Sequence, residues 1–148
     1  MAQLDVRESQ AALAQSIKRL QEKNLFTDEN AAEILLPAAD EMLSSAKSAF
    51  IQSGHSNDKP RRTGGTLKAF MRSGEVFRDK NKAPYVFVSL KDSDKRGQRY
   101  GAKAFILNYG RRAGGRITAD YYLSNAVKAT RPRVNQMMIE KIEEIFNK

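Results

Sequence analysis

The sequence contains no cysteine, and this absence removes several kinds of chemistry at once. Without thiols the chain cannot form disulfides, thiolate zinc sites or a cysteine nucleophile. Only one histidine is present, His55, so the histidine-rich ligand sets that bind zinc without cysteine cannot be assembled either. The acidic residues are dispersed among lysines, whereas a metal-dependent nuclease needs clustered carboxylates. We therefore expect no metal, no cofactor and no enzymatic activity.

Long apolar runs are missing as well. No stretch approaches the roughly 20 residues that a membrane-spanning helix requires. The N-terminal sequence MAQLDVRESQ has no basic segment followed by an apolar one, so it does not predict a signal peptide. These features predict a protein without membrane contact, and 148 residues suit a single domain.

Two short segments resemble ligand-binding loops but lack their essential residues. The sequence TGGT at residues 63–66 has no following GK[ST], which a phosphate-binding P-loop requires, and we interpret it as a linker. The sequence KDSDK at residues 91–95 has only two acids, and the flanking lysines would repel a cation. We interpret this second segment as the tip of a hairpin rather than a calcium site.

Apolar periodicity predicts helices at both ends of the chain. Residues 5–24 and 28–52 show helical spacing, with Thr27 as the N-cap of the second helix and Pro37 as a kink or break inside it. The last helix is expected to begin near Pro132, which suits a first helical turn. Residues 119–129 are expected to form only a turn and a helical turn or two.

The middle of the chain predicts β-structure. A helical turn is expected at residues 66–72, followed by strands at 75–78, 85–90 and 104–109 in an antiparallel meander. The predicted fold class is therefore α+β, with N-terminal helices and a C-terminal helix packed on a small antiparallel sheet that carries long basic loops. The expected order is a helical region (1–53), a basic loop (54–65), a mainly β region (66–110), a basic Gly/Arg loop (111–118) and a C-terminal helical region (119–148).

The net charge of +9 is concentrated in the middle of the sequence. Residues 1–53 carry a net charge of −3, residues 54–133 carry +13 and residues 134–148 carry −1. Such a field favours an acidic partner, either nucleic acid or an acidic protein surface. The candidate contact residues are the arginines, lysine and tyrosines of the basic loops, namely Arg61, Arg62, Lys95, Arg96, Arg99, Arg111, Arg112, Arg116, Tyr121 and Tyr122.

Composition alone does not decide between these two partners. Arginine grips planar phosphates and carboxylates, and tyrosine stacks on bases. Arginine and tyrosine are also enriched in the energetically dominant residues of protein interfaces. No helix–turn–helix, RNA-recognition or zinc-finger pattern accompanies the basic residues.

Three short motifs give the chain a resemblance to a known family. They are TGGTL at residues 63–67 with Ser73 further on, FILNYG at residues 105–110, and YLSNA at residues 122–126. In this order and spacing, over roughly residues 28–148, the sequence resembles the tail-completion or head–tail joining proteins of long-tailed bacteriophages. The family's usual acidic residue before the glycine of the second motif is absent here, where Asn108 and Tyr109 stand, and Asn125 replaces its usual proline in the third.

This resemblance implies a structural role in the virion neck. Such proteins assemble as a ring, commonly of six copies, between the head connector or adaptor and the tail terminator or tail tube. Ring contacts are head-to-tail, so the acidic helical part of one subunit could face the basic loops of the next. Alternatively, the basic loops could line the channel through which DNA passes.

The leading hypothesis is thus a ring-forming neck protein, assembled in the host cytoplasm and located in the virion. The alternative is a sequence-nonspecific nucleic-acid-binding protein. Under the leading hypothesis, residues 108–122 form an assembly loop. Its arginines are offered to an acidic neighbour or to DNA, and Tyr121, Tyr122 and Leu123 dock the chain before the last helix.

Overall fold

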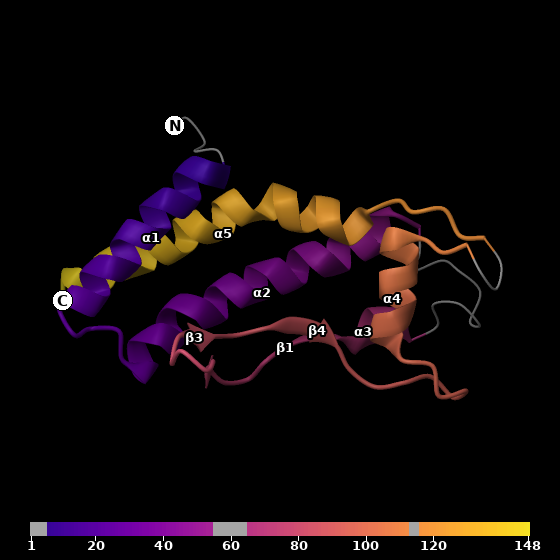
Figure 1. Ribbon diagram of the computed structural model, residues 1–148, viewed down its shortest axis with the longest axis horizontal. Coiled ribbons are helices and arrows are strands. Elements are labelled where there is room, and N and C mark those ends of the chain that lie inside the picture. The colour runs from indigo at the N-terminus through magenta and orange to yellow at the C-terminus, as the bar shows by residue number, and fades with distance from the viewer. Residues whose placement is uncertain (1–5, 55–64, 113–115) are drawn as a thin grey trace. The chain divides into compact units, whose positions relative to one another are not determined.

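The computed structural model describes residues 6–54, 65–112 and 116–148, and it confirms the predicted α+β class. Most of the basic loop predicted at residues 54–65, including Arg61 and Arg62, lies outside the described residues. None of the described helices combines the length and hydrophobicity needed to cross a bilayer. The elements are α1 (Val6–Glu22), α2 (Asp28–Gln52), α3 (Thr66–Ala69), β1 (Phe70–Arg72), β2 (Phe77–Arg78), β3 (Pro84–Tyr85), β4 (Val88–Leu90), α4 (Tyr100–Tyr109) and α5 (Tyr122–Phe146) (Figure 1).

The chain forms two compact units that alternate along the sequence. Unit 1 comprises residues 1–42, 72–87 and 128–148, and unit 2 comprises residues 43–71 and 88–127. Helix α2 therefore begins in unit 1 and ends in unit 2, whereas α5 begins in unit 2 and ends in unit 1.

In unit 1, α1 lies beside the C-terminal part of α5 (Figure 1). Leu20 and Ile142 are fully buried between these helices and pack with Ile34 of α2. Thr27 caps α2 as predicted, since its Oγ1 accepts a hydrogen bond of 3.2 Å from the N–H of Asn30. The apolar spacing predicted the packed faces of α1 and of the last helix, whereas on α2 the buried residue is Ile34 and not the predicted Leu35.

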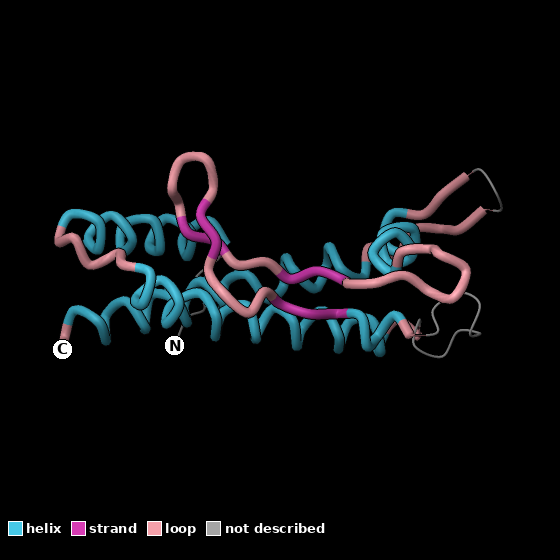
Figure 2. The backbone as a smooth tube through the Cα atoms, turned by 90° about the horizontal axis from the view of Figure 1, so that it is seen from below, coloured by secondary structure: helices cyan, strands magenta, loops and turns pink. Residues whose placement is uncertain are grey.

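The strands form two separate two-stranded sheets rather than one meander. In unit 1, β2 and β3 are an antiparallel hairpin that pairs Phe77 with Tyr85, and its turn projects away from the neighbouring backbone (Figure 2). The stretch 85–90, predicted as a single strand, is interrupted at residues 86 and 87. Its first part therefore pairs with β2, and its second part, β4, pairs with β1.

The strand predicted at residues 104–109 is wrong, because this segment is the second half of α4. Its buried residues, Lys103, Ala104, Leu107 and Asn108, follow a helical period rather than an alternation. Gly110 has φ 77° and its N–H bonds to the carbonyl of Ile106 at 2.6 Å. The glycine thus ends a helix, and not a strand as predicted.

The expected break before the last helix is also wrong. Helix α5 runs from Tyr122 to Phe146 with Pro132 in its interior, and α2 likewise continues through Pro37. An interior proline costs about 3 kcal/mol, since one hydrogen bond is lost and its ring crowds the preceding turn.

Candidate interaction surface

The net charge of the protein is confined to one of the two units. Unit 1 contains thirteen basic and thirteen acidic residues, so it is neutral. Unit 2 contains thirteen basic and only four acidic residues, so it carries the entire net charge of +9. A candidate site for an acidic partner therefore belongs to unit 2.

The acidic residues of α2 are largely neutralised inside unit 1. Each of four carboxylates has a basic partner that lies far along the sequence. These carboxylates consequently offer little charge to a neighbouring subunit, which weakens the idea that this helical region complements the basic loops. The pairs are Asp28 with Arg78, Glu33 with Lys148, Asp40 with Arg72 and Glu41 with Arg133.

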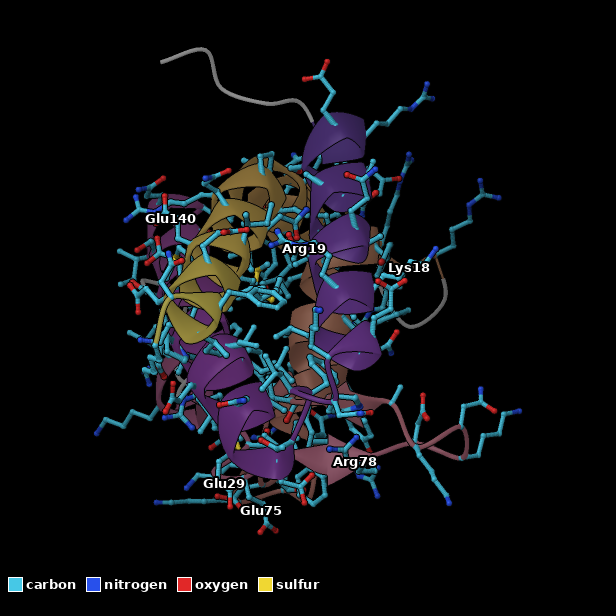
Figure 3. All side chains as sticks on the ribbon, turned by 90° about the vertical axis from the view of Figure 1, so that its left-hand side faces the viewer. Lys18, Arg19, Glu29, Glu75, Arg78 and Glu140 are labelled. Atoms are coloured by element: carbon cyan, nitrogen blue, oxygen red, sulfur yellow. The ribbon has the colours of Figure 1, made fainter. Side chains whose placement is uncertain are left out.

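Helix α1 shows the same internal use of charge. Arg19 lies on the side of α1 that faces α5, whereas Lys18 points outward (Figure 3). The Arg19 guanidinium binds the Glu143 carboxylate at 2.9 Å and lies 4.5 Å from the centre of the Phe146 ring. Unit 1 thus uses arginine to join its own helices.

Unit 2 contains a cavity of about 380 Å³ beside α4. Its rim is basic and its floor is partly apolar, formed by Ile106 and Leu107 of α4 and by Ile117. The basic residues that line it are Arg96, Arg99, Lys103 and Arg111. The structure therefore brings together three of the arginines predicted as contact residues, although they come from two different loops.

Lys103 is neutralised by Asp94 within this cavity. The side chain of Lys103 is 9% exposed and its ammonium forms an ion pair with Asp94 Oδ2. Asp94 Oδ1 accepts hydrogen bonds from the N–H groups of Arg96 and Gln98, at 2.8 and 2.9 Å. A bridge between Ser93 and Arg99 closes this turn, which leads into α4 and not into the predicted third strand. The bond from Lys103 holds the pKa of Asp94 below its usual value of 3.8.

This pair predicts a specific acid sensitivity. A carboxyl group whose pKa is lowered by folding contributes stability above its unfolded pKa, and this contribution is lost as the pH falls through the folded pKa. Replacing Asp94→Asn keeps an acceptor for the loop N–H groups but removes the charge. We expect the variant to be less stable than the wild type at neutral pH and to approach it as the pH falls below 3.8. Thermal unfolding across this pH range measures the effect.

The control for this prediction is Asp92→Asn, an exposed carboxylate two residues earlier in the same loop. It should leave the pH dependence of the unfolding temperature unchanged. A constant difference between Asp94→Asn and the wild type from neutral to acid pH would contradict the assigned ion pair.

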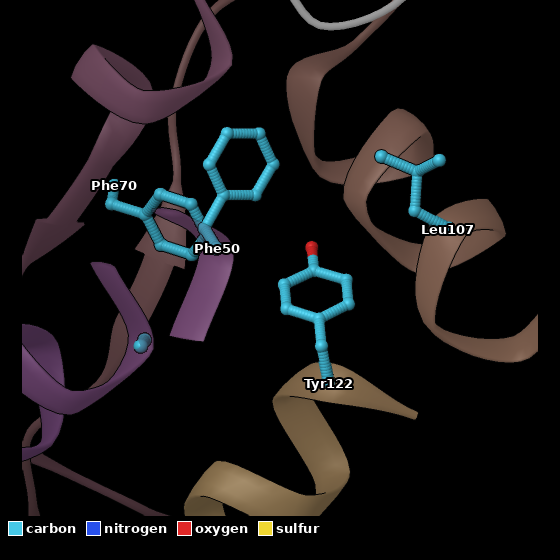
Figure 4. Packing of buried hydrophobic residues seen from close by; sticks show 5 residues of the cluster. Phe50, Phe70, Leu107 and Tyr122 are labelled. Atoms are coloured by element: carbon cyan, nitrogen blue, oxygen red, sulfur yellow. The ribbon is translucent and has the colours of Figure 1, made fainter. Parts of the chain in front are cut away.

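Tyr122, predicted both to dock the chain and to contact a partner, is a core residue. It is 6% exposed, and its hydroxyl donates a hydrogen bond of 3.3 Å to the carbonyl of Ala104. Its ring packs against Phe50 near Phe70, while Leu107 approaches from α4 (Figure 4). Burial raises the pKa of Tyr122 well above its usual value of 10.0. The docking role is therefore confirmed, and the ring is not available at the surface.

Tyr121 is instead exposed and belongs to a cluster of aromatic rings, the α4 aromatic cluster, formed by Phe105, Tyr109 and Tyr121. These residues are 60%, 52% and 49% exposed. The ring centres of Phe105 and Tyr109 are 4.6 Å apart, and those of Tyr109 and Tyr121 are 6.2 Å apart. Because residues 104–109 were predicted to be a strand, this exposed aromatic surface of a helix was not predicted. Positions 105 and 109 nevertheless have the i, i+4 spacing of one helix face.

The remaining predicted contact residues that the structure describes do not line the cavity. Lys95 is exposed in the turn after β4. Arg112 and Arg116, which flank the undescribed residues 113–115, are also exposed. Arg111 and Ile117 exchange two backbone hydrogen bonds of 2.9 and 3.0 Å, which bring the two ends of the Gly/Arg loop together. The loop is therefore anchored at its base beside the cavity.

Comparison with known proteins adds no assignment to this surface. No protein-family model matches the chain, and no curated protein and no solved structure is significantly similar to it. Among residues 6–54, 65–112 and 116–148, no group of three or more His, Cys, Asp or Glu side chains could hold a metal ion. The interpretation of the surface therefore depends on its own geometry and charge.

Proposed function

We propose that this protein is a structural, non-enzymatic component of the bacteriophage neck, a tail-completion or head–tail joining protein that forms a ring, commonly of six copies. The observation that supports this most is the meeting of the three family-like motifs in one core. Leu67 of the first motif, Leu107 of the second and Leu123 of the third all pack in the cluster around Phe50 in unit 2. Motifs separated along the chain thus belong to one folded unit.

Direct contacts also connect the motifs. Asn108 Oδ1 accepts hydrogen bonds from the N–H groups of Leu123 and Ser124, at 2.9 and 3.1 Å. Gly65 has φ 86°, and a Cβ atom there would lie 2.5 Å from the hydroxyl of Tyr100. Gly65, the extra glycine that follows Thr63-Gly64, and Asn108 of the second motif therefore have structural reasons to be where they are.

The proposed role accounts for the positive charge of unit 2. A ring between the head connector or adaptor and the tail terminator or tail tube must bind other proteins and surround the passing DNA. Because unit 2 carries the net charge of +9, we assign these contacts to unit 2. The protein would be assembled in the host cytoplasm and reside in the virion.

The ring is tested by sedimentation and native mass measurement of the full chain, alone and with the connector or tail-tube protein. We expect a closed oligomer. The triple replacement of Arg111, Arg112 and Arg116 by glutamine should reduce assembly or tail joining by roughly tenfold or more, because arginines are often dominant interface residues. The circular dichroism spectrum should not change, since all three residues lie outside the hydrophobic clusters.

A matched control removes three positive charges from the neutral unit instead. Arg7, Lys18 and Lys23 are exposed on or next to α1, and their replacement by glutamine should leave assembly unchanged. Wild-type protein that remains monomeric with and without its partners would refute the proposed function. Normal joining by the Arg111, Arg112 and Arg116 variant would refute the role given to the loop.

A second candidate function, sequence-nonspecific nucleic-acid binding, is favoured by the excess of positive charge in unit 2. It predicts that the isolated protein retards DNA or RNA in a mobility-shift assay. The logarithm of the affinity should fall with the logarithm of the salt concentration with a slope of several units. Failure to bind at low salt would remove this candidate. The neck function does not depend on the result, because its contacts with DNA can be transient.

A further inference from the structure

We infer that the exposed face of α4, made of the α4 aromatic cluster and the neighbouring arginine-lined cavity, binds an acidic segment of a partner protein that carries an apolar side chain beside its carboxylates. The inference rests on the proposed function for the existence of a protein partner. It goes further in naming the surface and the chemistry of the segment that it binds.

The two parts of this face are adjacent on one helix. Ala102 and Ile106 line the cavity, while Phe105 and Tyr109 carry the aromatic cluster. At 3.6 residues per turn, positions 102 and 106 form one row along α4 and positions 105 and 109 form the next. A segment that lies across α4 would therefore meet the cavity and the aromatic rings together.

The aromatic cluster is held exposed at a cost in backbone energy. Tyr121 has φ 54°, a left-handed conformation that a bulky residue rarely adopts and that costs on the order of 1 kcal/mol or more. The N–H of Tyr121 bonds to the carbonyl of Asn108 at 3.0 Å, and this bond fixes the strained residue at the end of α4. Strain that keeps an exposed ring against Tyr109 is characteristic of a binding surface.

The geometry favours a protein segment over nucleic acid. The rings of Phe105 and Tyr109 are tilted by 47° at 4.6 Å, and those of Tyr109 and Tyr121 meet edge to face at 84°. Rings at these angles do not present the parallel faces on which successive bases stack. Interlocked aromatic residues beside a basic rim instead match the anatomy of a protein interface.

The cavity explains why the segment should be both acidic and apolar. Ile106, Leu107 and Ile117 in its lining suit an apolar side chain, which a phosphate group lacks. Its rim carries Arg96 and Arg99, with which no carboxylate forms an ion pair in the part of the chain that the structure describes. Arginine binds carboxylates through two parallel hydrogen bonds, so these two residues select an acidic segment.

The partner segment should come from a different protein rather than from α2 of a second copy. Four of the five carboxylates of α2 are already paired, with Arg72, Arg78, Arg133 and Lys148. A second copy could offer these carboxylates only by giving up the ion pairs that they already form. Charge complementarity is satisfied more readily by an acidic partner.

The test measures the binding of fluorescent synthetic peptides to the full-length protein by anisotropy. The first peptide alternates leucine with glutamate, the second replaces glutamate by glutamine, and the third replaces leucine by serine. Single-stranded and duplex oligonucleotides serve as competing probes. We expect only the first peptide to bind well, and neither oligonucleotide to displace it.

Two double variants and their matched controls locate the site. Phe105→Ala with Tyr109→Ala should weaken peptide binding by roughly tenfold or more, and so should Arg96→Gln with Arg99→Gln. Tyr85→Ala with Phe87→Ala removes two aromatic residues of unit 1 that are 43% and 40% exposed, and should have no effect. Replacing Arg7 and Lys18 of α1 by glutamine is the corresponding charge control.

The outcomes separate this inference from the proposed function. Ring assembly without peptide binding, or equal binding by the α4 variants and their controls, would overturn the inference and leave the neck function standing. Peptide binding that requires α4, in a protein that never assembles, would support the surface and overturn the neck function. Displacement of the peptide by an oligonucleotide, with loss of both in the α4 variants, would assign the surface to nucleic acid and overturn the inference.

Discussion

Replacing Phe50→Ala should lower the free energy of unfolding by about 3–5 kcal/mol, the largest effect expected of any single substitution in unit 2. Phe50 is 0% exposed, and its ring meets Phe70 at 5.6 Å and Tyr122 at 5.9 Å between ring centres, in both cases edge to face (Figure 4). Truncation removes these contacts and leaves a cavity that the surrounding helices can fill only in part. Urea unfolding followed by circular dichroism measures the loss.

The next residue provides the control for this prediction. Ile51 lies on the same helix but is 51% exposed, so Ile51→Ala should cost less than about 1 kcal/mol. Similar losses for the two variants would contradict the position of Phe50 at the centre of the core. The comparison is well matched because both changes remove a large apolar side chain near the same end of α2.

The core around Phe50 also positions the candidate surface. Tyr122 is anchored by Phe50 and by the carbonyl of Ala104, and it directly follows the strained residue Tyr121. Leu107 enters the same core from the side of α4 opposite the exposed Phe105. Buried residues thus fix the direction in which the α4 aromatic cluster points, so Phe50→Ala should weaken partner binding as well as stability.

Helices α1 and α2 could be predicted because their signals are local. The bounds predicted for α2, residues 28–52, are those observed, since Thr27 marks its start and an unbroken apolar stripe extends to its end. Helix α1 was predicted as residues 5–24 and is observed as Val6–Glu22. In both cases neighbouring residues carry the information that determines the element.

Helix α4 could not be predicted in the same way. The run AFILNY is short and apolar, and such a run fits a buried strand as well as a buried helix. What decides is the burial of Lys103 and Asn108, two polar residues that are satisfied by partners elsewhere in the chain, Asp94 and the start of α5. Tertiary contacts of this kind override local preference and are not visible as a sequence pattern.

The candidate site was predicted in its composition but not in its arrangement. The sequence indicated a basic middle region, and the structure assigns the whole net charge to unit 2. The segment charges could not show that the acids of α2 are already paired, because partners such as Arg133 lie far along the chain. They also could not show that Arg96, Arg99 and Arg111 share one cavity.

Replacing Asn108→Ala should lower the free energy of unfolding by about 2–3 kcal/mol. Asn108 is 2% exposed and acts as a cap for α5 from a different helix, because its Oδ1 accepts the N–H groups of Leu123 and Ser124 and its Nδ2 donates to Ser124 Oγ at 2.9 Å. Alanine would leave two N–H groups at the start of α5 without an acceptor. Thermal and urea unfolding measure the change, and the exposed Asn125→Ala in the same helical turn is the control.

Asn108→Asp tests whether the cap is the cause. A carboxylate accepts the same two N–H groups and is favoured by the positive end of the α5 dipole, so the aspartate variant should be much more stable than Asn108→Ala. Only the hydrogen bond to Ser124 Oγ would need to reverse its direction, with the hydroxyl as donor. Equal destabilisation by alanine and aspartate would show that packing, and not capping, makes Asn108 important.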